Sequence, residues 1–155
     1  MSKRVMAMLV GVVALAVLVA GCGSSDDETT TVEVSLTKAQ FVKQGSKVCA
    51  EELKTMSKGL KAFSDEHDLT KKLNKEDTEE LVETVFQPGF EGQFEGLGEL
   101  SPPKGDEKQV EAILTQFEEG LDKGSENKEK FVAELSTAMR ALEKYGIKEC
   151  DGLYL

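Results

Sequence analysis

The residues of this chain that could carry reactive chemistry are few: three cysteines and one histidine in 155 residues. The histidine lies in Asp65-Glu66-His67-Asp68, a group that could bind a cation or supply a base. Adjacent residues of a helix point in different directions, so the group is a poor set of ligands. We therefore interpret His67 as a solvated residue at a helix end, where the helix dipole favours it. No nucleophile elbow or calcium loop accompanies it, so we expect no catalytic residues, no metal site and no cofactor.

The first cysteine ends an apolar stretch, residues 5–20, that follows a short basic start. As a helix this stretch would span roughly 24 Å, less than the ~30 Å hydrocarbon core. That length is typical of a secretory signal peptide, and an uncleaved membrane anchor is the alternative. VAGC (residues 19–22) resembles the lipobox of bacterial lipoproteins. The resemblance implies that residues 1–21 are removed and that lipid on Cys22 anchors the protein to the outer face of the cell membrane.

The rest of the chain is acidic, and the formal net charge of the whole sequence is −10. Such a surface repels phosphate backbones and anionic lipid headgroups, so we expect no nucleic acid partner. Residues 22–35 are polar and acidic without helical periodicity, which predicts a lipidated cysteine followed by a flexible tether. The folded domain is expected to cover residues 36–155.

Within that domain the apolar residues recur with a helical period, and no segment alternates as a strand would. The sequence therefore predicts an all-α fold, a small antiparallel four-helix bundle. Capping residues, glycines and prolines give the expected helix bounds: from Thr37 to between Ser64 and His67, from Asn74 or Asp77 to Leu100 with a kink at Pro88, from Asp106 to just before Gly124, and from Ser125 or Asn127 to Gly146.

The other two cysteines, Cys49 and Cys150, form an even pair, which outside the cytoplasm is most simply a disulfide. In an up-down bundle the chain after Gly146 emerges near the start of the first helix, within reach of Cys49. We therefore expect a disulfide that holds the C-terminal tail. Two thiolates binding a soft metal are the alternative.

Two further stretches, LTKAQFVKQGSKVCAE (residues 36–51) and YGIKEC (residues 145–150), carry a wider resemblance. Together with the lipobox and the tether, they resemble a group of small, uncharacterised actinobacterial helical lipoproteins. The resemblance implies the same location and the same disulfide, and it implies no biochemical activity.

The glycine-rich segment 88–100 is the least regular helix of the prediction, and its glycines could let neighbouring helices approach closely. Phe90, Phe94 and Leu97 could form a partner surface there, and packing of the phenylalanines in the core is the alternative. The leading hypothesis is a monomeric, non-catalytic binding or structural module of the cell envelope that contacts an envelope protein. The alternatives are a carrier of a small apolar ligand or metal inside the bundle and a small envelope hydrolase. An exposed phenylalanine patch favours the first, and an interior cavity favours the carrier.

Overall fold

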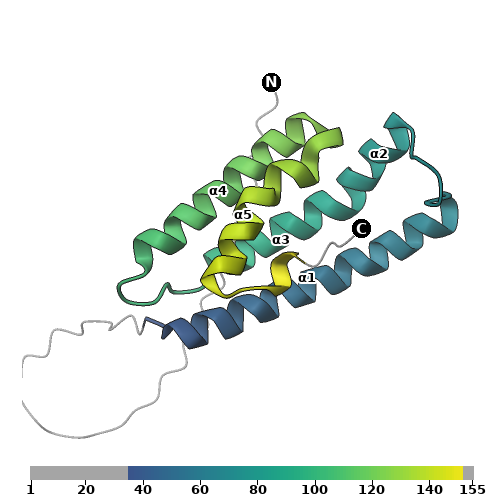
Figure 1. The fold of residues 1–155 in the computed structure, drawn as a ribbon. Coiled ribbons are helices and arrows are strands. Elements are labelled where there is room, and N and C mark those ends of the chain that lie inside the picture. Colours follow the sequence, from purple (N-terminus) through teal and green to yellow (C-terminus); the bar gives the residue numbers. More distant parts are fainter. Residues whose placement is uncertain (1–34, 152–155) are drawn as a thin grey trace, which may run out of the picture. The chain divides into compact units, whose positions relative to one another are not determined.

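The computed structural model describes residues 35–151, and these residues are helical, with no strand among them (Figure 1). This confirms the all-α prediction. The predicted signal peptide, Cys22 and nearly all of the predicted tether lie outside the described residues. The elements are α1 (Lys38–Glu66), α2 (Lys75–Leu81), the π-helix η1 (Val82–Phe86), α3 (Gln87–Gly98), α4 (Glu107–Glu126), the 3-10 turn η2 (Lys128–Lys130), α5 (Phe131–Tyr145) and the 3-10 turn η3 (Glu149–Asp151).

The start of α1 is set by the predicted capping box. The Thr37 side chain accepts a hydrogen bond from the Gln40 backbone N–H, and the Gln40 side chain accepts one from the Thr37 N–H. These bonds satisfy two of the backbone donors that a helix start leaves without partners. The helix ends at Glu66 with His67 as its C-cap, within the predicted range.

The second predicted helix is one helical stretch whose hydrogen-bond ladder changes ahead of Pro88. Asn74 caps it by accepting from the Asp77 N–H at 2.9 Å. Pro88 has no N–H, and in an α-helix its ring would clash with the carbonyl four residues earlier. The turn before it is π-helical, and the Gln87 N–H donates to the Val82 carbonyl five residues back. The irregularity expected at Pro88 is thus a wider turn that precedes the proline.

The glycines of α3 allow α1 to approach closely, as their positions suggested. A Cβ atom at Gly92 would lie 2.8 Å from the Glu52 carboxyl carbon, and one at Gly96 would lie 2.6 Å from a Val48 methyl carbon. Both distances are shorter than van der Waals contact. A side chain at Gly96 would overlap the stiff Val48, whereas one at Gly92 would displace only the flexible end of Glu52.

The junction between α4 and α5, which pack side by side (Figure 1), differs from the prediction. Gly124 was expected to follow the third helix, but it is buried inside α4, which continues to Glu126. A Cβ atom there would lie 2.6 Å from the Phe131 ring, so Gly124 serves close packing instead of helix termination. The fourth helix accordingly begins at Phe131, after η2.

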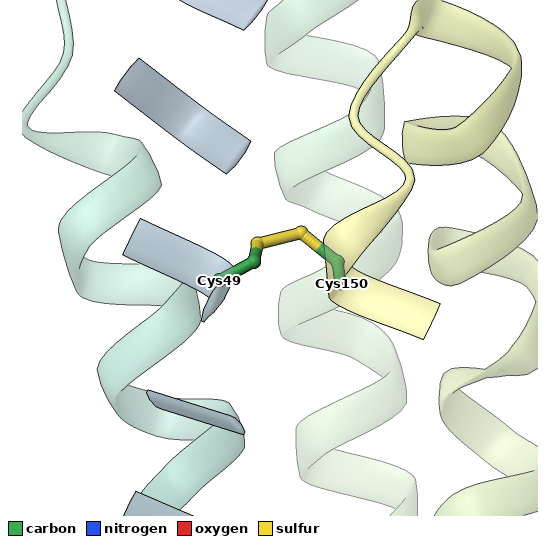
Figure 2. Close-up of a disulfide and its surroundings, with 2 residues drawn as sticks. All are labelled: Cys49 and Cys150. Atoms are coloured by element: carbon green, nitrogen blue, oxygen red, sulfur yellow. A yellow bond between two sulfur atoms is a disulfide. The ribbon is translucent and has the colours of Figure 1, made fainter. Parts of the chain in front are cut away.

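The end of α5 brings the tail back to α1 as expected. Gly146 has φ +123°, and the Ile147 N–H donates to the Leu142 carbonyl at 2.9 Å, which closes the predicted Schellman ending. Figure 2 shows Cys150 joined to Cys49, with their Cα atoms 4.8 Å apart. Both cysteines are buried. The disulfide prediction is confirmed, and these two sulfurs are not thiolates available to a metal.

Candidate functional site

The predicted partner surface is formed by only one of its three residues. Phe90 and Leu97 are 2% and 1% exposed, and the Phe90 ring centroid lies 6.0 Å from that of Phe131. Phe90 and Leu97 lie seven residues apart, two turns along the same helical face, and that face of α3 is turned into the core. The prediction that these two side chains form a surface is therefore wrong. Phe94 is half-buried, and its outer edge is accessible.

Phe94 lines a surface hollow of about 230 Å³ between the end of α3 and the start of α4, which we call the α3–α4 groove. Its floor is apolar, and three glutamates stand on its α4 side. The lining residues are Phe94, Gly98, Leu100, Pro102, Glu107, Val110, Glu111, Leu114, Thr115 and Glu118. The glutamates recur with a helical period, so this rim is visible in the sequence. The opposite wall is set by tertiary packing alone.

A second groove, the α1–η1 groove, lies where α1 meets the π-helix and has a volume of about 350 Å³. It adjoins a hollow of about 290 Å³ that shares Gly59, Thr84 and Val85 with it. Glu52 and Met56 of α1 and Pro88 of α3 complete the larger part. π-helical turns occur frequently at functional sites because they change the direction of neighbouring side chains. Apart from Pro88, no residue in the sequence indicates this turn.

His67 lies at the end of α1 as expected, but it is not the solvated residue that we predicted. Its ring stacks on Phe63 with centroids 4.0 Å apart and planes 7° apart, and its side chain is only 20% exposed. Nδ1 lies 3.5 Å from Asp77, and Nε2 lies 4.0 Å from Glu80. Because the two carboxylates face different ring nitrogens, they cannot share one metal ion with this histidine. Within residues 35–151, no group of three or more His, Cys, Asp or Glu side chains is arranged to hold a metal.

Tyr145 connects the starts of two helices to the end of a third. Its hydroxyl donates to the Asp106 carboxylate at 2.8 Å, and Lys38 lies 3.3 Å from the same carboxylate and 4.3 Å from the centre of the tyrosine ring. The hydrogen bond from Tyr145 lowers the pKa of Asp106 below its usual 3.8, while burial, followed by the Asp106 hydrogen bond, raises the pKa of Tyr145 above its usual 10.0. Asp106 was expected to cap α4 with its side chain, but that side chain makes no capping bond. This cluster is structural, since it fastens α1, α4 and α5 together.

Gln93 is the one buried polar residue of the described core, with 0% of its surface exposed. Neither its side-chain nitrogen nor its side-chain oxygen has a hydrogen-bond partner among the described residues. It shares the inward face of α3 with Phe90 and Leu97, so its burial follows from the same rotation of the helix. An unsatisfied buried amide costs stability and offers no substrate contact, because none of the grooves described above reaches it.

A small hollow lies among α1, α3, α4 and α5, but its volume is only about 10 Å³. It is bounded by Phe41, Leu97 and Tyr145 among others. That is room for about one water molecule, whereas small-molecule sites measure about 300–1,000 Å³. This hollow therefore gives no support to a ligand carried inside the bundle.

Comparisons of the chain with protein-family models, with curated proteins and with solved structures find no match. In the part of the chain that the structure describes, no helix has both the length and the apolar character needed to cross a bilayer. The lipoprotein resemblance stays a prediction from the sequence. The two surface grooves are the features of residues 35–151 that best suit binding.

Proposed function

We propose that this protein is a lipid-anchored, extracytoplasmic and non-catalytic binding module of the bacterial cell envelope. The proposal rests on the different roles of the three cysteines. Cys49 and Cys150 form a buried disulfide, a bond typical of oxidising compartments outside the cytoplasm. Cys22 is the remaining cysteine, and it stands at the lipidation position of the VAGC motif. Its lipid would hold the domain at the outer face of the membrane.

We further propose that the described helices form an antiparallel four-helix bundle in which α2, η1 and α3 count as one helix. The order of the close approaches between α1 and α3 supports this arrangement. Gly92 meets Glu52, and Gly96, one turn further along α3, meets Val48, one turn earlier along α1. Successive approaches thus run in opposite directions along the two helices.

The α3–α4 groove is the proposed partner site. It contains Phe94, the predicted partner residue that remains accessible, and its apolar floor opens to solvent between polar walls. A small apolar patch with a polar rim is the usual anatomy of a protein interface. At about 230 Å³ the groove is smaller than sites for drug-sized molecules, which favours side chains of a protein partner.

A second candidate function, carriage of a small apolar ligand, is favoured by the α1–η1 groove instead. Its volume of about 350 Å³ falls in the range of small-molecule sites. Apolar atoms of Met56, Val85 and Pro88 contribute to its lining. Native mass spectrometry of the exported chain tests this candidate, since a co-purifying small molecule would support it.

Lipid anchoring is tested by labelling growing bacteria with radioactive palmitate and comparing the wild type with Cys22→Ser. We expect the wild-type protein to carry label and to enter the detergent phase on phase partition, and we expect the variant to do neither. A Cys49→Ser, Cys150→Ser chain is the matched control and should still be labelled. A labelled Cys22→Ser chain, or an unlabelled wild type, would refute the anchor.

The partner site is tested with a photo-crosslinking amino acid at Thr115, an exposed position in the α3–α4 groove. The matched control is the same probe at Thr137, which is exposed on α5. We expect a discrete adduct in intact cells from position 115 only. Equal adducts from both positions, or none from Thr115, would contradict the assignment of this groove.

A further inference from the structure

We propose that the α3–α4 groove binds a cationic amphipathic helix of its partner. This inference rests on the proposed function, because it names the chemistry of the partner at the same site. Its first support is the shape of the floor. Leu100 and Leu114 are half-buried, and Phe94 packs against the buried Phe117 with ring centroids 5.8 Å apart. The floor is thus a fixed apolar strip, supported from beneath by the core.

The second support is the charge of the α4 wall. Glu107, Glu111 and Glu118 line the groove, whereas no lysine or arginine does. Among the described residues, none of these three carboxylates lies within 4 Å of a basic side chain. The Glu107 carboxylate accepts a hydrogen bond from the Gly105 N–H at 2.8 Å, and this bond lowers its pKa. The wall therefore presents three carboxylates that form no ion pair with the described basic side chains.

The third support is the charge of α3 beside the groove. The charged residues of α3 and its C-cap are Glu91, Glu95 and Glu99, and all three are exposed, although none of them lines the groove itself. An apolar strip with one acidic wall and further carboxylates nearby is complementary to a helix with an apolar face flanked by lysine or arginine. An anionic membrane surface would be repelled by the same carboxylates, so the partner is a protein segment.

The length of the acidic wall fits a helix of a few turns. From Glu107 to Glu118 the α4 axis advances about 16 Å, which corresponds to about three helical turns. A partner helix of this length can place apolar side chains at i, i+3, i+4 and i+7 on the floor. Its basic side chains then reach the carboxylates along the α4 wall.

The binding test uses a fluorescent, amphipathic peptide of leucine and lysine, about four turns long. A scrambled peptide of the same composition, without a segregated apolar face, is the control probe. The protein is the full chain carrying Cys22→Ser, which keeps lipid out of the assay. We expect fluorescence anisotropy to show saturable binding of the amphipathic peptide, much weaker binding of the scrambled one, and loss of affinity as salt rises.

Two variants locate the binding, and the first of them has a matched control. Glu111→Lys with Glu118→Lys should weaken binding about tenfold, whereas Glu126→Lys with Glu129→Lys, the same charge change at the far end of α4, should have little effect. Gly98→Phe adds a ring where a Cβ atom meets nothing within 4 Å, so it should fill the groove without a change of charge. It should also weaken binding. Circular dichroism confirms that each variant is folded.

Each opposite result overturns the inference. Equal losses in the two charge variants would mean general attraction between an acidic protein and a basic peptide. Unchanged binding by Gly98→Phe would place the peptide elsewhere. If Thr115 crosslinks a partner in cells while the peptide fails to bind, the partner chemistry is wrong and the partner site stands. If the peptide binds and Thr115 crosslinks nothing in cells, the groove binds such a helix in solution, but the proposed role as a partner site in the cell is wrong.

Discussion

Removal of the Cys49–Cys150 disulfide should lower the stability of this domain strongly. The bond joins residues 101 positions apart. Closing a loop of about 100 residues lowers the entropy of the unfolded chain, which raises its free energy by about 4.7 kcal/mol at 25 °C. Folded domains are stable by only about 5–15 kcal/mol. A Cys49→Ala, Cys150→Ala chain should therefore lose a large share of its free energy of unfolding.

The expected shift in melting temperature follows from the size of the domain. With about 120 ordered residues, the entropy of unfolding is about 0.25 kcal/mol/K, so the crosslink corresponds to a Tm lower by about 19 °C. The loss should also have a distinct signature. An unfolded chain without the crosslink exposes more surface, so the slope of the unfolding free energy against urea should increase.

The assay is thermal and urea unfolding followed by far-ultraviolet circular dichroism. Reduced wild type is the matched control, because it keeps both sulfur atoms and lacks only the bond. We expect the reduced wild type and the double variant to melt close together and far below the oxidised wild type. If reduction shifts Tm by less than about 4 °C, which is about 1 kcal/mol, the unfolded chain is not restrained as argued and the reasoning is refuted.

Three further predictions concern single side chains. Gln93→Met removes a buried amide that has no hydrogen-bond partner, so Tm should rise by about 4 °C or more in a thermal melt. A lower Tm would show that the amide forms hydrogen bonds in solution. Gly98→Ala should raise the free energy of unfolding by about 0.5–1 kcal/mol in urea titrations, because its Cβ atom meets open space, whereas Gly89→Ala should lower it by about 1–3 kcal/mol, because its Cβ atom would overlap Met56. The Tyr145→Phe change should raise the pKa of Asp106 toward 3.8, measured by carboxyl NMR titration, and an unchanged pKa would contradict the hydrogen bond.

The same hydrogen bond predicts how stability depends on pH. The pKa of Asp106 is lowered in the folded state, so its contribution is present above pH 3.8 and is lost as the pH falls through the lowered value. The pKa of Tyr145 is raised, so its contribution is present below pH 10.0 and is lost as the pH rises further. The stability difference between wild type and Tyr145→Phe should therefore be largest between these two pH values.

The sequence by itself determined the features that depend on local hydrogen bonds and on the helical period. The capping box at Thr37, the cap at Asn74 and the Schellman ending at Gly146 all form where the sequence places them. Each involves residues only a few positions apart, so its energy hardly depends on the rest of the fold. The cysteine pairing was also predictable, because the sequence assigns Cys22 to the lipobox motif and the two cysteines that remain have only each other as partners.

Only the tertiary structure decided which way each helix is rotated and what lies opposite it. The helical period shows that Phe90, Phe94 and Leu97 are near one another, but burial of the first and last depends on how α3 packs against α4 and α5. The Asp106 side chain could have capped α4 locally, but its carboxylate accepts a hydrogen bond from Tyr145, 39 positions away. Such choices are set by the relative placement of whole helices, which local sequence rules do not encode.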